Sequence, residues 1–135
     1  MVSRIHHINF LVRDLDRALN RYQALLEPSE VIREELPQRG VNSARLRVGD
    51  TWIVLLQPYD DHGVPGRHLA KHGEGFFMIS YQADDLSAAC ARAVAAGIDV
   101  LDAEPRQGLA DWKVRDLAPD DLFGVCSQLT ESDES

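Results

Sequence analysis

The two halves of this chain repeat each other at an offset of 71 residues, which is the separation of Asp14 from Asp85. At this offset several other positions also agree: Leu15 with Leu86, Ala18 with Ala89, Arg21 with Arg92, and the segment 7–10 with 78–81. A repeat restricts the fold strongly, because each copy must form the same supersecondary unit. In both copies a strand-like segment, an aspartate and a helical segment follow one another.

Each copy has the periodicity of one strand followed by one amphipathic helix. Apolar residues alternate at positions 8, 10 and 12, and then recur every three or four positions from Leu15 to Leu26. Asp14 is the expected N-cap of this helix and Pro28 stops it, while Asp85 and Gly97 have these roles in the second copy. Further strands are expected at 31–36, 43–48, 51–57, 99–101, 112–117 and 125–130.

One helix and about four strands per copy predict an α+β fold of two tandem βαβββ modules, which form a curved, incomplete barrel with a ligand trough. We expect a single domain over residues 1–130. Module 1 is expected at about 3–58, a linker rich in Gly, Pro and His at about 59–74, and module 2 at about 75–130. The charged tail 131–135 contains no apolar residue and is expected to be disordered.

Composition argues against several classes of protein. The formal charge of −8, from 22 acidic and 14 basic residues, disfavours nucleic acid and anionic lipid as partners and weakly favours a cationic ligand. No apolar stretch approaches the ~20 residues that span a bilayer, and no targeting segment precedes the first strand, so a cytoplasmic protein is expected. Cys90 and Cys126 lack metal-site or redox spacing and are expected to be reduced and structural.

Strand periodicity also sorts side chains between the helix and the trough. Residues that pack on the helix must be the consistently apolar set, so the alternate residues face the trough. These are His7 and the predicted ligand-binding residues Asn9, Trp52, Val54, Leu56, Phe76, Met78, Ser80 and Gln128. Apolar walls with a few polar groups are typical of a small-molecule site, although a single buried His or Gln is more often a structural group with an ordinary hydrogen bond.

Short segments in a specific order resemble the vicinal oxygen chelate superfamily (glyoxalase / bleomycin resistance / dioxygenase), and are most similar to methylmalonyl-CoA epimerases. The segments are Ile5-His6-His7-Ile8 with Val12-Arg13-Asp14-Leu15, Glu34-Glu35-Leu36-Pro37 with Gly40-Val41, Gly73-Glu74-Gly75, Ala83-Asp84-Asp85-Leu86, and Ala103-Glu104-Pro105-Arg106. The resemblance covers nearly the whole chain, and paired βαβββ modules are the family's architecture.

The resemblance implies a divalent metal held by four side chains, one from each of four strands, and this chain lacks most of them. The first ligand, a His, matches His7, whereas the other three positions match Val54, Met78 and Gln128. Val offers no donor atom and Met is too soft for a hard cation. The remaining histidines are no substitute, because His6 has the wrong strand parity and three others lie in the linker (His62, His68 and His72). We therefore expect neither a metal nor another cofactor.

Two classes of function fit these features. A binding protein would hold a small-molecule ligand in the trough, as members of the resembled family without metal ligands do. A metal-independent enzyme, such as an isomerase or cyclase of secondary metabolism, would use His7, Glu34 or Glu35 as acid–base group and Asn9 or Gln128 as oxyanion partner. Simple catalytic decay is a third interpretation.

The resemblance keeps one further alternative open, a divergent methylmalonyl-CoA epimerase or another glyoxalase-type isomerase or lyase. In such epimerases one base falls near Glu34 and Glu35, and the pattern does not select which of the two faces the trough. The resemblance also implies modules that pack between chains. Because sheet edges need pairing or cover, we expect a homodimer.

Overall fold

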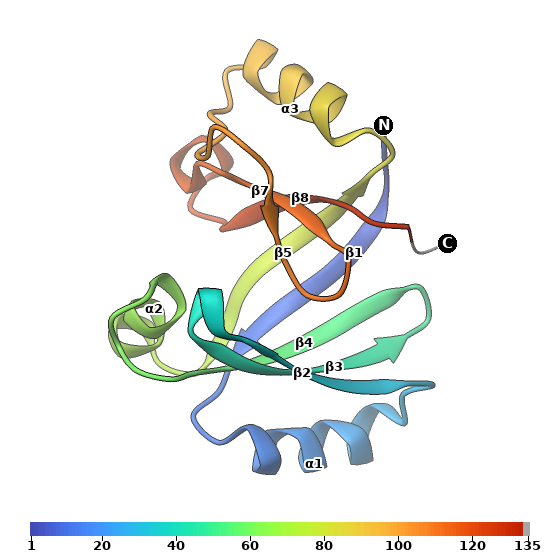
Figure 1. Cartoon of the computed structure of the whole chain (residues 1–135), viewed down its shortest axis with the longest axis vertical. Coiled ribbons are helices and arrows are strands. Elements are labelled where there is room, and N and C mark those ends of the chain that lie inside the picture. Colours follow the sequence, from blue (N-terminus) through green and yellow to red (C-terminus); the bar gives the residue numbers. More distant parts are fainter. Residues whose placement is uncertain (134–135) are drawn as a thin grey trace. The chain divides into compact units, whose positions relative to one another are not determined.

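The computed structural model describes residues 1–133, which form strands, three α-helices and two short 3₁₀ turns (Figure 1). In chain order the elements are β1 (Val2–Leu11), α1 (Leu15–Leu26), β2 (Val31–Leu36), η1 (Pro37–Arg39), β3 (Val41–Val48), β4 (Thr51–Pro58), α2 (Val64–His72), β5 (Gly75–Ala83), α3 (Leu86–Ala95), β6 (Arg106–Gln107), β7 (Lys113–Leu117), η2 (Pro119–Leu122) and β8 (Ser127–Glu131). Among these residues, no helix is long and apolar enough to cross a membrane.

The chain divides into two compact units that share one strand pattern. The first, here called the α1 unit, is His7–Phe77, and its strand order is β2-β3-β4-β1. The second, the α3 unit, consists of Met1–His6 and the chain from Met78 onward, and its strand order is β1-β5-β8-β7-β6. In the α1 unit β4 runs parallel to β1, and in the α3 unit β8 runs parallel to β5. The remaining pairs, β2 with β3, β3 with β4, β6 with β7 and β7 with β8, are antiparallel. The α+β class and the two βαβββ modules are therefore confirmed.

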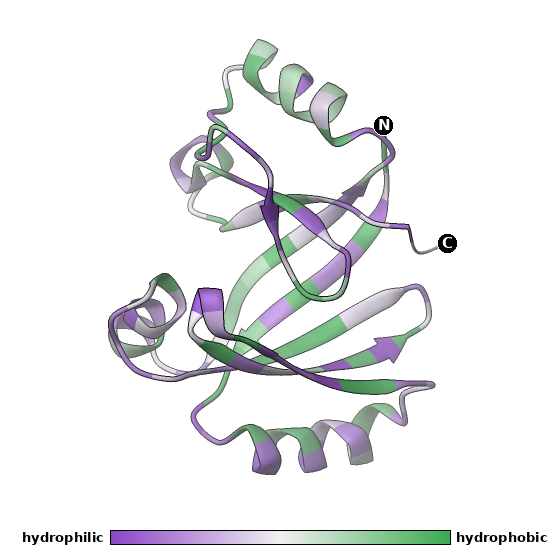
Figure 2. Cartoon of the chain, viewed as in Figure 1, coloured by the Kyte–Doolittle hydropathy of each residue, from purple (hydrophilic) through white to green (hydrophobic). Residues whose placement is uncertain are grey.

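Each unit has its own helix packed on one face of its sheet. α1 begins after Asp14, whose carboxylate accepts from Arg17 N at 3.1 Å, and α3 begins after Asp85, whose carboxylate accepts from Ala88 N at 3.0 Å. The predicted caps are thus confirmed. The α1 core contains Val12, Leu15, Leu19, Ala44, Leu46 and Leu55, and the α3 core contains Ala83, Leu86, Ala89, Cys90, Leu117 and Leu129. Figure 2 shows the apolar and polar bands that alternate along α1, as expected of a helix with one buried side.

A second contact secures the start of both helices. The first N–H of α1, at Leu15, donates to Gln57 Oε1 at 2.8 Å, and the first N–H of α3, at Leu86, donates to Glu131 Oε1 at 3.0 Å. Gln57 lies near the end of β4 and Glu131 is the last residue of β8. The fourth strand of each module therefore supplies a side chain that satisfies a helix N-terminus.

This contact corrects one expectation about the C-terminal tail. Disorder was expected for 131–135, but Glu131 is ordered in β8 because its carboxylate has a structural partner in Leu86 N–H. Ser132 also has a partner, since its hydroxyl donates to Gln82 Oε1 at 3.2 Å. Residues 134 and 135 lie outside the described part of the chain.

Two other expectations differ from the structure. The predicted linker contains a helix, α2, because its Gly and Pro residues are helix-end signals: Pro65 lies in the first turn and Gly73 ends the helix with φ +80°. The strand expected at 99–101 is only a single bridge from Val100 to Leu117, whereas the short β6 was not foreseen. The module boundaries themselves stay a prediction.

α2 carries a histidine in an unfavourable place for a charge. The His68 ring centroid lies 4.8 Å from that of Phe77 and 4.5 Å from that of His72, and its Nδ1 is buried without a hydrogen-bond partner among the described residues. Burial, and then the neighbouring His72 and Lys71, lower the pKa of His68 below its usual 6.5. The folded state therefore resists a proton that the unfolded chain accepts.

The first prediction concerns the contact between β8 and α3. Glu131→Ala should lower the free energy of unfolding by about 1 kcal/mol, the typical net value of one hydrogen bond, because Leu86 N–H loses its partner. Glu131→Gln should retain most of this stability, since Gln57 makes the same contact in the other module. Urea denaturation at pH 7 checks both variants, and equal losses for Ala and Gln would contradict a hydrogen-bonding role.

The second prediction follows from His68. Its contribution to stability is complete above pH 6.5, the usual value, and is lost as the pH falls below it, because the unfolded chain then binds the proton first. His68→Gln should therefore flatten the fall in the urea midpoint between pH 7.5 and 5.5. His62→Gln is the matched control, since the His62 side chain is 86% exposed, and the same flattening in both variants would refute the prediction.

Candidate ligand-binding face

In the α1 unit, alternate residues of three strands point away from α1 and are nevertheless buried. Phe10, Val12 and Leu55 pack in the α1 core, so their strand neighbours face the opposite side. That side, here called the helix-free face of the α1 unit, carries His7, Asn9, Leu11, Ser43, Arg45, Trp52, Val54 and Leu56, all buried. The predicted parity of β1 and β4 is confirmed. The use of this helix-free face as a ligand site stays a prediction.

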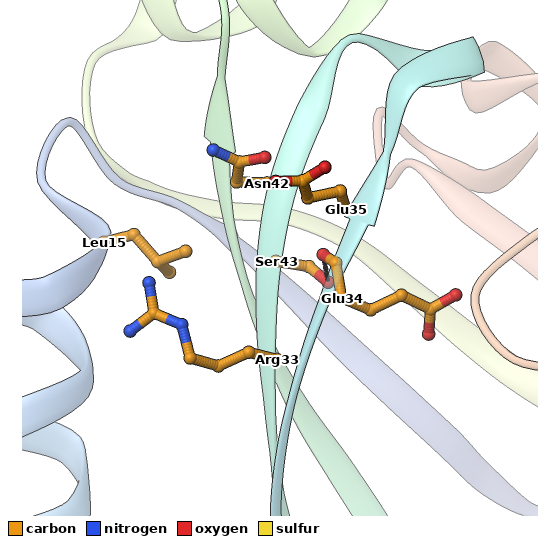
Figure 3. A pocket seen from close by; sticks show the side chains of 6 residues that line it. All are labelled: Leu15, Arg33, Glu34, Glu35, Asn42 and Ser43. Carbon is orange, nitrogen blue, oxygen red and sulfur yellow. Dashed lines mark hydrogen bonds between the residues drawn. The ribbon is translucent and has the colours of Figure 1, made fainter.

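Glu34 and Glu35 separate on either side of β2. Figure 3 shows Glu35 and Arg33 directed toward the side on which Leu15 lies, and Glu34 directed away from it. Arg33 on that side pairs with Asp16 of α1 at 2.7 Å. A cavity of about 280 Å³ beside β2 is lined by residues from both sides of the sheet, namely Leu15, Arg33, Glu34, Glu35, Asn42 and Ser43. Of the two candidate bases, Glu34 thus lies with the helix-free face and Glu35 with the α1 side.

Glu34 meets a buried cation that the sequence analysis did not single out. Glu34 Oε1 lies 2.7 Å from Arg45 Nη1, and the Arg45 side chain is only 6% exposed. The guanidinium carbon of Arg45 lies 5.2 Å from the Trp52 ring centroid, and that of Arg47 lies 5.1 Å from it, which are cation–π distances. Arg45 shares the parity of Ser43 in the predicted strand 43–48, so strand alternation alone was the signal that could have found it.

In the α3 unit, the side of the sheet opposite α3 carries a continuous polar network. Tyr81 and Leu129 pack against α3, which places Met78, Ser80, Gln82, Gln128 and Thr130 on the other side, the helix-free face of the α3 unit. Ser80 Oγ contacts Thr130 Oγ1, and Thr130 Oγ1 donates to Gln128 Oε1 at 3.4 Å. Gln128 Nε2 then donates to Asp116 Oδ1 at 3.0 Å. The predicted parity of Met78, Ser80 and Gln128 is therefore confirmed.

Phe76 and Cys126 are less buried than the residues of these two faces. Phe76, expected in the trough, is 49% exposed at the start of β5. Burial and the Asp116 carboxylate raise the pKa of the Cys126 thiol, which keeps it protonated and a poor nucleophile at neutral pH. Cys90 lies in the α3 core as expected, and both cysteines are free.

The side chains at the four family metal positions do not fit a divalent cation. The two family positions in the α1 unit are His7 and Val54. Val54 has no donor atom and is 1% exposed. In the α3 unit Met78 is a soft thioether, and the Gln128 amide already bonds Asp116 and Thr130. Within residues 1–133, no group of three or more His, Cys, Asp and Glu side chains is arranged to hold a metal ion. A hard cation needs several oxygen or imidazole ligands, which this set does not offer.

The remaining histidines have other surroundings. His6 packs edge-on against Trp112 at 4.5 Å between ring centroids, and its Nε2 lies 3.2 Å from Ser132 Oγ. His68 and His72 lie together on α2, and His62 is exposed. None of these contacts forms a ligand set with His7 in the described part of the chain.

Comparisons with known proteins relate this arrangement to a family. A family model described as the Glyoxalase/Bleomycin resistance protein/Dioxygenase superfamily matches residues 6–115. The ethylmalonyl-CoA/methylmalonyl-CoA epimerase of Cereibacter sphaeroides is 29% identical over 133 residues, which cover 97% of this chain and 99% of that protein. Metallothiol transferase FosB of Shouchella clausii is 28% identical over 108 residues, covering 79% of this chain and 66% of that one.

Solved structures agree with this result. A methylmalonyl-CoA epimerase in complex with methylmalonyl-CoA and NH4+ matches with a TM-score of 0.93 at 31% identity, covering 98% of this chain and 96% of that chain. Both modules are thus included in the match. The chain belongs to the glyoxalase/bleomycin resistance/dioxygenase superfamily, with the fold of its methylmalonyl-CoA epimerases.

Proposed function

We propose that this protein binds a small acyl thioester with an anionic group, of the kind that its epimerase relatives act on, against the helix-free face of the α1 unit. The buried Arg45 carries this proposal. In the proposed complex, Arg45 supplies the positive charge that a divalent metal supplies in the family. His7, Asn9, Trp52, Val54 and Leu56 form the surrounding wall.

The surroundings of Arg45 support an anionic ligand. Burying a guanidinium costs several kcal/mol unless it is paired. Even a paired one adds little net stability to the fold, so stability alone does not account for a buried arginine here. Arg45 Nη1 donates to the Glu34 carboxylate at 2.7 Å, so this buried guanidinium already binds a carboxylate, the anionic group that an arginine fork recognises well. Arg45 also lies directly opposite Val54 in the β3–β4 pairing, where the family resemblance places a metal ligand. The net charge of the chain weakly favours a cationic ligand, but the positive charge of Arg45 on this face favours an anionic one.

Sequestration is the first form of this function and catalysis is the second. Glu34, the candidate base on this face, is held by Arg45, which favours a binding role for the pair. Similarity to epimerases along the whole chain supports the second form, a divergent isomerase or lyase in which His7 or Glu34 moves the proton. Deuterium uptake at C2 of methylmalonyl-CoA in D2O separates the two forms, because only a proton-transfer enzyme accelerates it.

Assembly and location are part of the same proposal. A homodimer would cover exposed sheet edges, and the ligand would reach the protein in the cytoplasm. Both stay predictions. Neither nucleic acid nor membrane is proposed as a partner.

Arg45→Met should weaken methylmalonyl-CoA binding by about tenfold or more, because charge-assisted hydrogen bonds contribute about 1.5–3 kcal/mol. Propionyl-CoA, which lacks the carboxylate, should lose less affinity. Isothermal titration calorimetry with both esters, in buffer containing EDTA, measures the difference.

Two variants make this test specific. Arg33→Met is the matched control, since Arg33 lies on the other side of β2 in an exposed pair with Asp16. Glu34→Gln retains Arg45 and removes its carboxylate partner, so methylmalonyl-CoA affinity should not fall. Equal losses for both esters in Arg45→Met, or no binding of either ester by the unmodified protein, would count against the proposal.

The absence of a catalytic divalent metal is the next prediction. Protein purified without chelator should contain no stoichiometric Zn, Mn, Co or Ni, and EDTA should leave its melting temperature unchanged, because a bound metal would stabilise the folded state by mass action. His7→Ala should alter ligand binding independently of added metal. Elemental analysis that finds about one metal per chain, lost in His7→Ala, would show that another ligand set exists.

A further inference from the structure

We propose that a groove beside α1 binds an aromatic phosphate ester of nucleotide size. The groove has a volume of about 630 Å³ and lies between the end of β1, α1 and the start of β5. Its lining includes Phe10, Arg13, Arg17, Arg21, Tyr22 and Glu74, all of which belong to the α1 unit. The groove is separate from the helix-free face, because Phe10 and Tyr22 pack against the α1 core on the opposite side of the sheet.

Three arginines line the groove at intervals of four residues along the chain. Arg17 and Arg21 therefore lie next to each other on one side of α1, with about 5–6 Å between their Cβ atoms. Arg13 is paired with Glu74, with 3.6 Å between Arg13 Nη1 and Glu74 Oε1. The side chains of Arg17 and Arg21 form no ion pair with any residue in the range 1–133. Two neighbouring guanidinium groups are thus free to bind an anion.

The fold of α1 does not account for these two arginines. Arg17 is the third residue of α1, where the helix dipole disfavours a positive charge. The last turn of α1, where a positive charge would be favourable, contains no basic residue. Like charges four positions apart on a helix also repel each other. A phosphate bound between Arg17 and Arg21 would remove this repulsion.

The two carboxylates of the groove already have partners. Asp14 accepts from Arg17 N at 3.1 Å as the cap of α1, and Glu74 accepts from Arg13 N at 2.9 Å. Three arginines and two acids give the lining a formal charge of +1, in a chain whose formal net charge is −8. A small phosphate ester is therefore attracted here, whereas a long polyanion would also meet the acidic remainder of the chain.

The rings of Phe10 and Tyr22 provide the apolar part of the groove. Their centroids lie 5.9 Å apart at an interplanar angle of 28°, and both side chains are only half-buried. An aromatic ligand can pack against such rings while guanidinium groups bind its phosphate. The volume of the groove also lies within the usual range of small-molecule sites, about 300–1,000 Å³. A nucleoside phosphate combines the ring and the charge that this lining fits.

Isothermal titration calorimetry at low ionic strength, with three probes, tests the proposal. The probes are AMP, adenosine, which lacks the phosphate, and inorganic phosphate, which lacks the ring. AMP should bind more tightly than either part. Arg17→Met and Arg21→Met should each weaken AMP binding by about tenfold, the effect of one charge-assisted hydrogen bond, and should leave adenosine binding unchanged. Tyr22→Leu should weaken AMP binding but not phosphate binding, whereas Tyr22→Phe should retain both.

Arg92→Met is the matched control. Arg92 corresponds to Arg21 in the second copy of the repeat and is an exposed arginine of α3, but it does not line this groove. This variant should bind AMP like the unmodified protein. The proposal would be overturned by equal losses of AMP affinity in Arg21→Met and Arg92→Met, by adenosine binding as tight as that of AMP, or by no AMP binding at millimolar concentration.

A nucleoside phosphate has two sources, a free nucleotide and the nucleotide end of a CoA ester. Titration of AMP into protein saturated with methylmalonyl-CoA distinguishes them: lost AMP binding assigns the groove to the ester, and unchanged AMP binding assigns it to a free nucleotide. Arg45→Met should leave AMP binding unchanged, because Arg45 lies on the helix-free face. If the protein binds no CoA ester, the proposed function fails, while AMP binding still decides whether the groove is a site.

Discussion

The packing of one helix against one face of each unit's sheet is the constraint on which the rest of this structure depends. α1 covers a side of its sheet that contains Phe10, Val12 and Leu55, and α3 covers the side that contains Tyr81 and Leu129. Because strand side chains alternate, every residue between these is committed to the opposite face. The fourth strand of each module strengthens this arrangement, since Gln57 and Glu131 bond the first N–H of the helix beside them.

The helix-free faces of the two units hold charges of opposite sign at corresponding places. In the α1 unit the third strand carries Arg45 opposite Val54, and Glu34 of the outer strand pairs with it. In the α3 unit the third strand carries Asp116 opposite Gln128, and Arg106 of the outer strand pairs with it. Each pair is an ion pair between neighbouring strands, so its cost of burial is offset within its own sheet. In the proposed function, the contact with the ligand comes from one of these pairs, Arg45 with Glu34.

The likeness to the family does not extend to most of the side chains at the positions that the resemblance assigns to a metal. The whole fold is shared with methylmalonyl-CoA epimerases, yet Val54 and Met78 offer no ligand for a hard cation. The helix-facing cores do not depend on these positions, because Val54 and Met78 lie on the opposite faces of their sheets.

Much of this followed from local pattern in the sequence. The repeat, the caps Asp14 and Asp85 and the face on which His7, Val54 and Gln128 lie all depend on spacing along one segment, and spacing is visible without a structure. Two local expectations failed where one signal has two meanings: Gly and Pro in the linker mark the ends of α2, and the acidic Glu131 is a capping partner rather than part of a solvated tail.

The sides of β2 on which Glu34 and Glu35 lie, and the contacts of Arg45 and Asp116, were decided only by tertiary structure. Parity along β2 is ambiguous in sequence, because both faces of this edge strand carry polar residues. Arg45 and Asp116 became meaningful only when strand register placed them beside Glu34, Trp52, Arg106 and Gln128. Register is set by pairing between segments distant in the chain, and no local pattern contains that information.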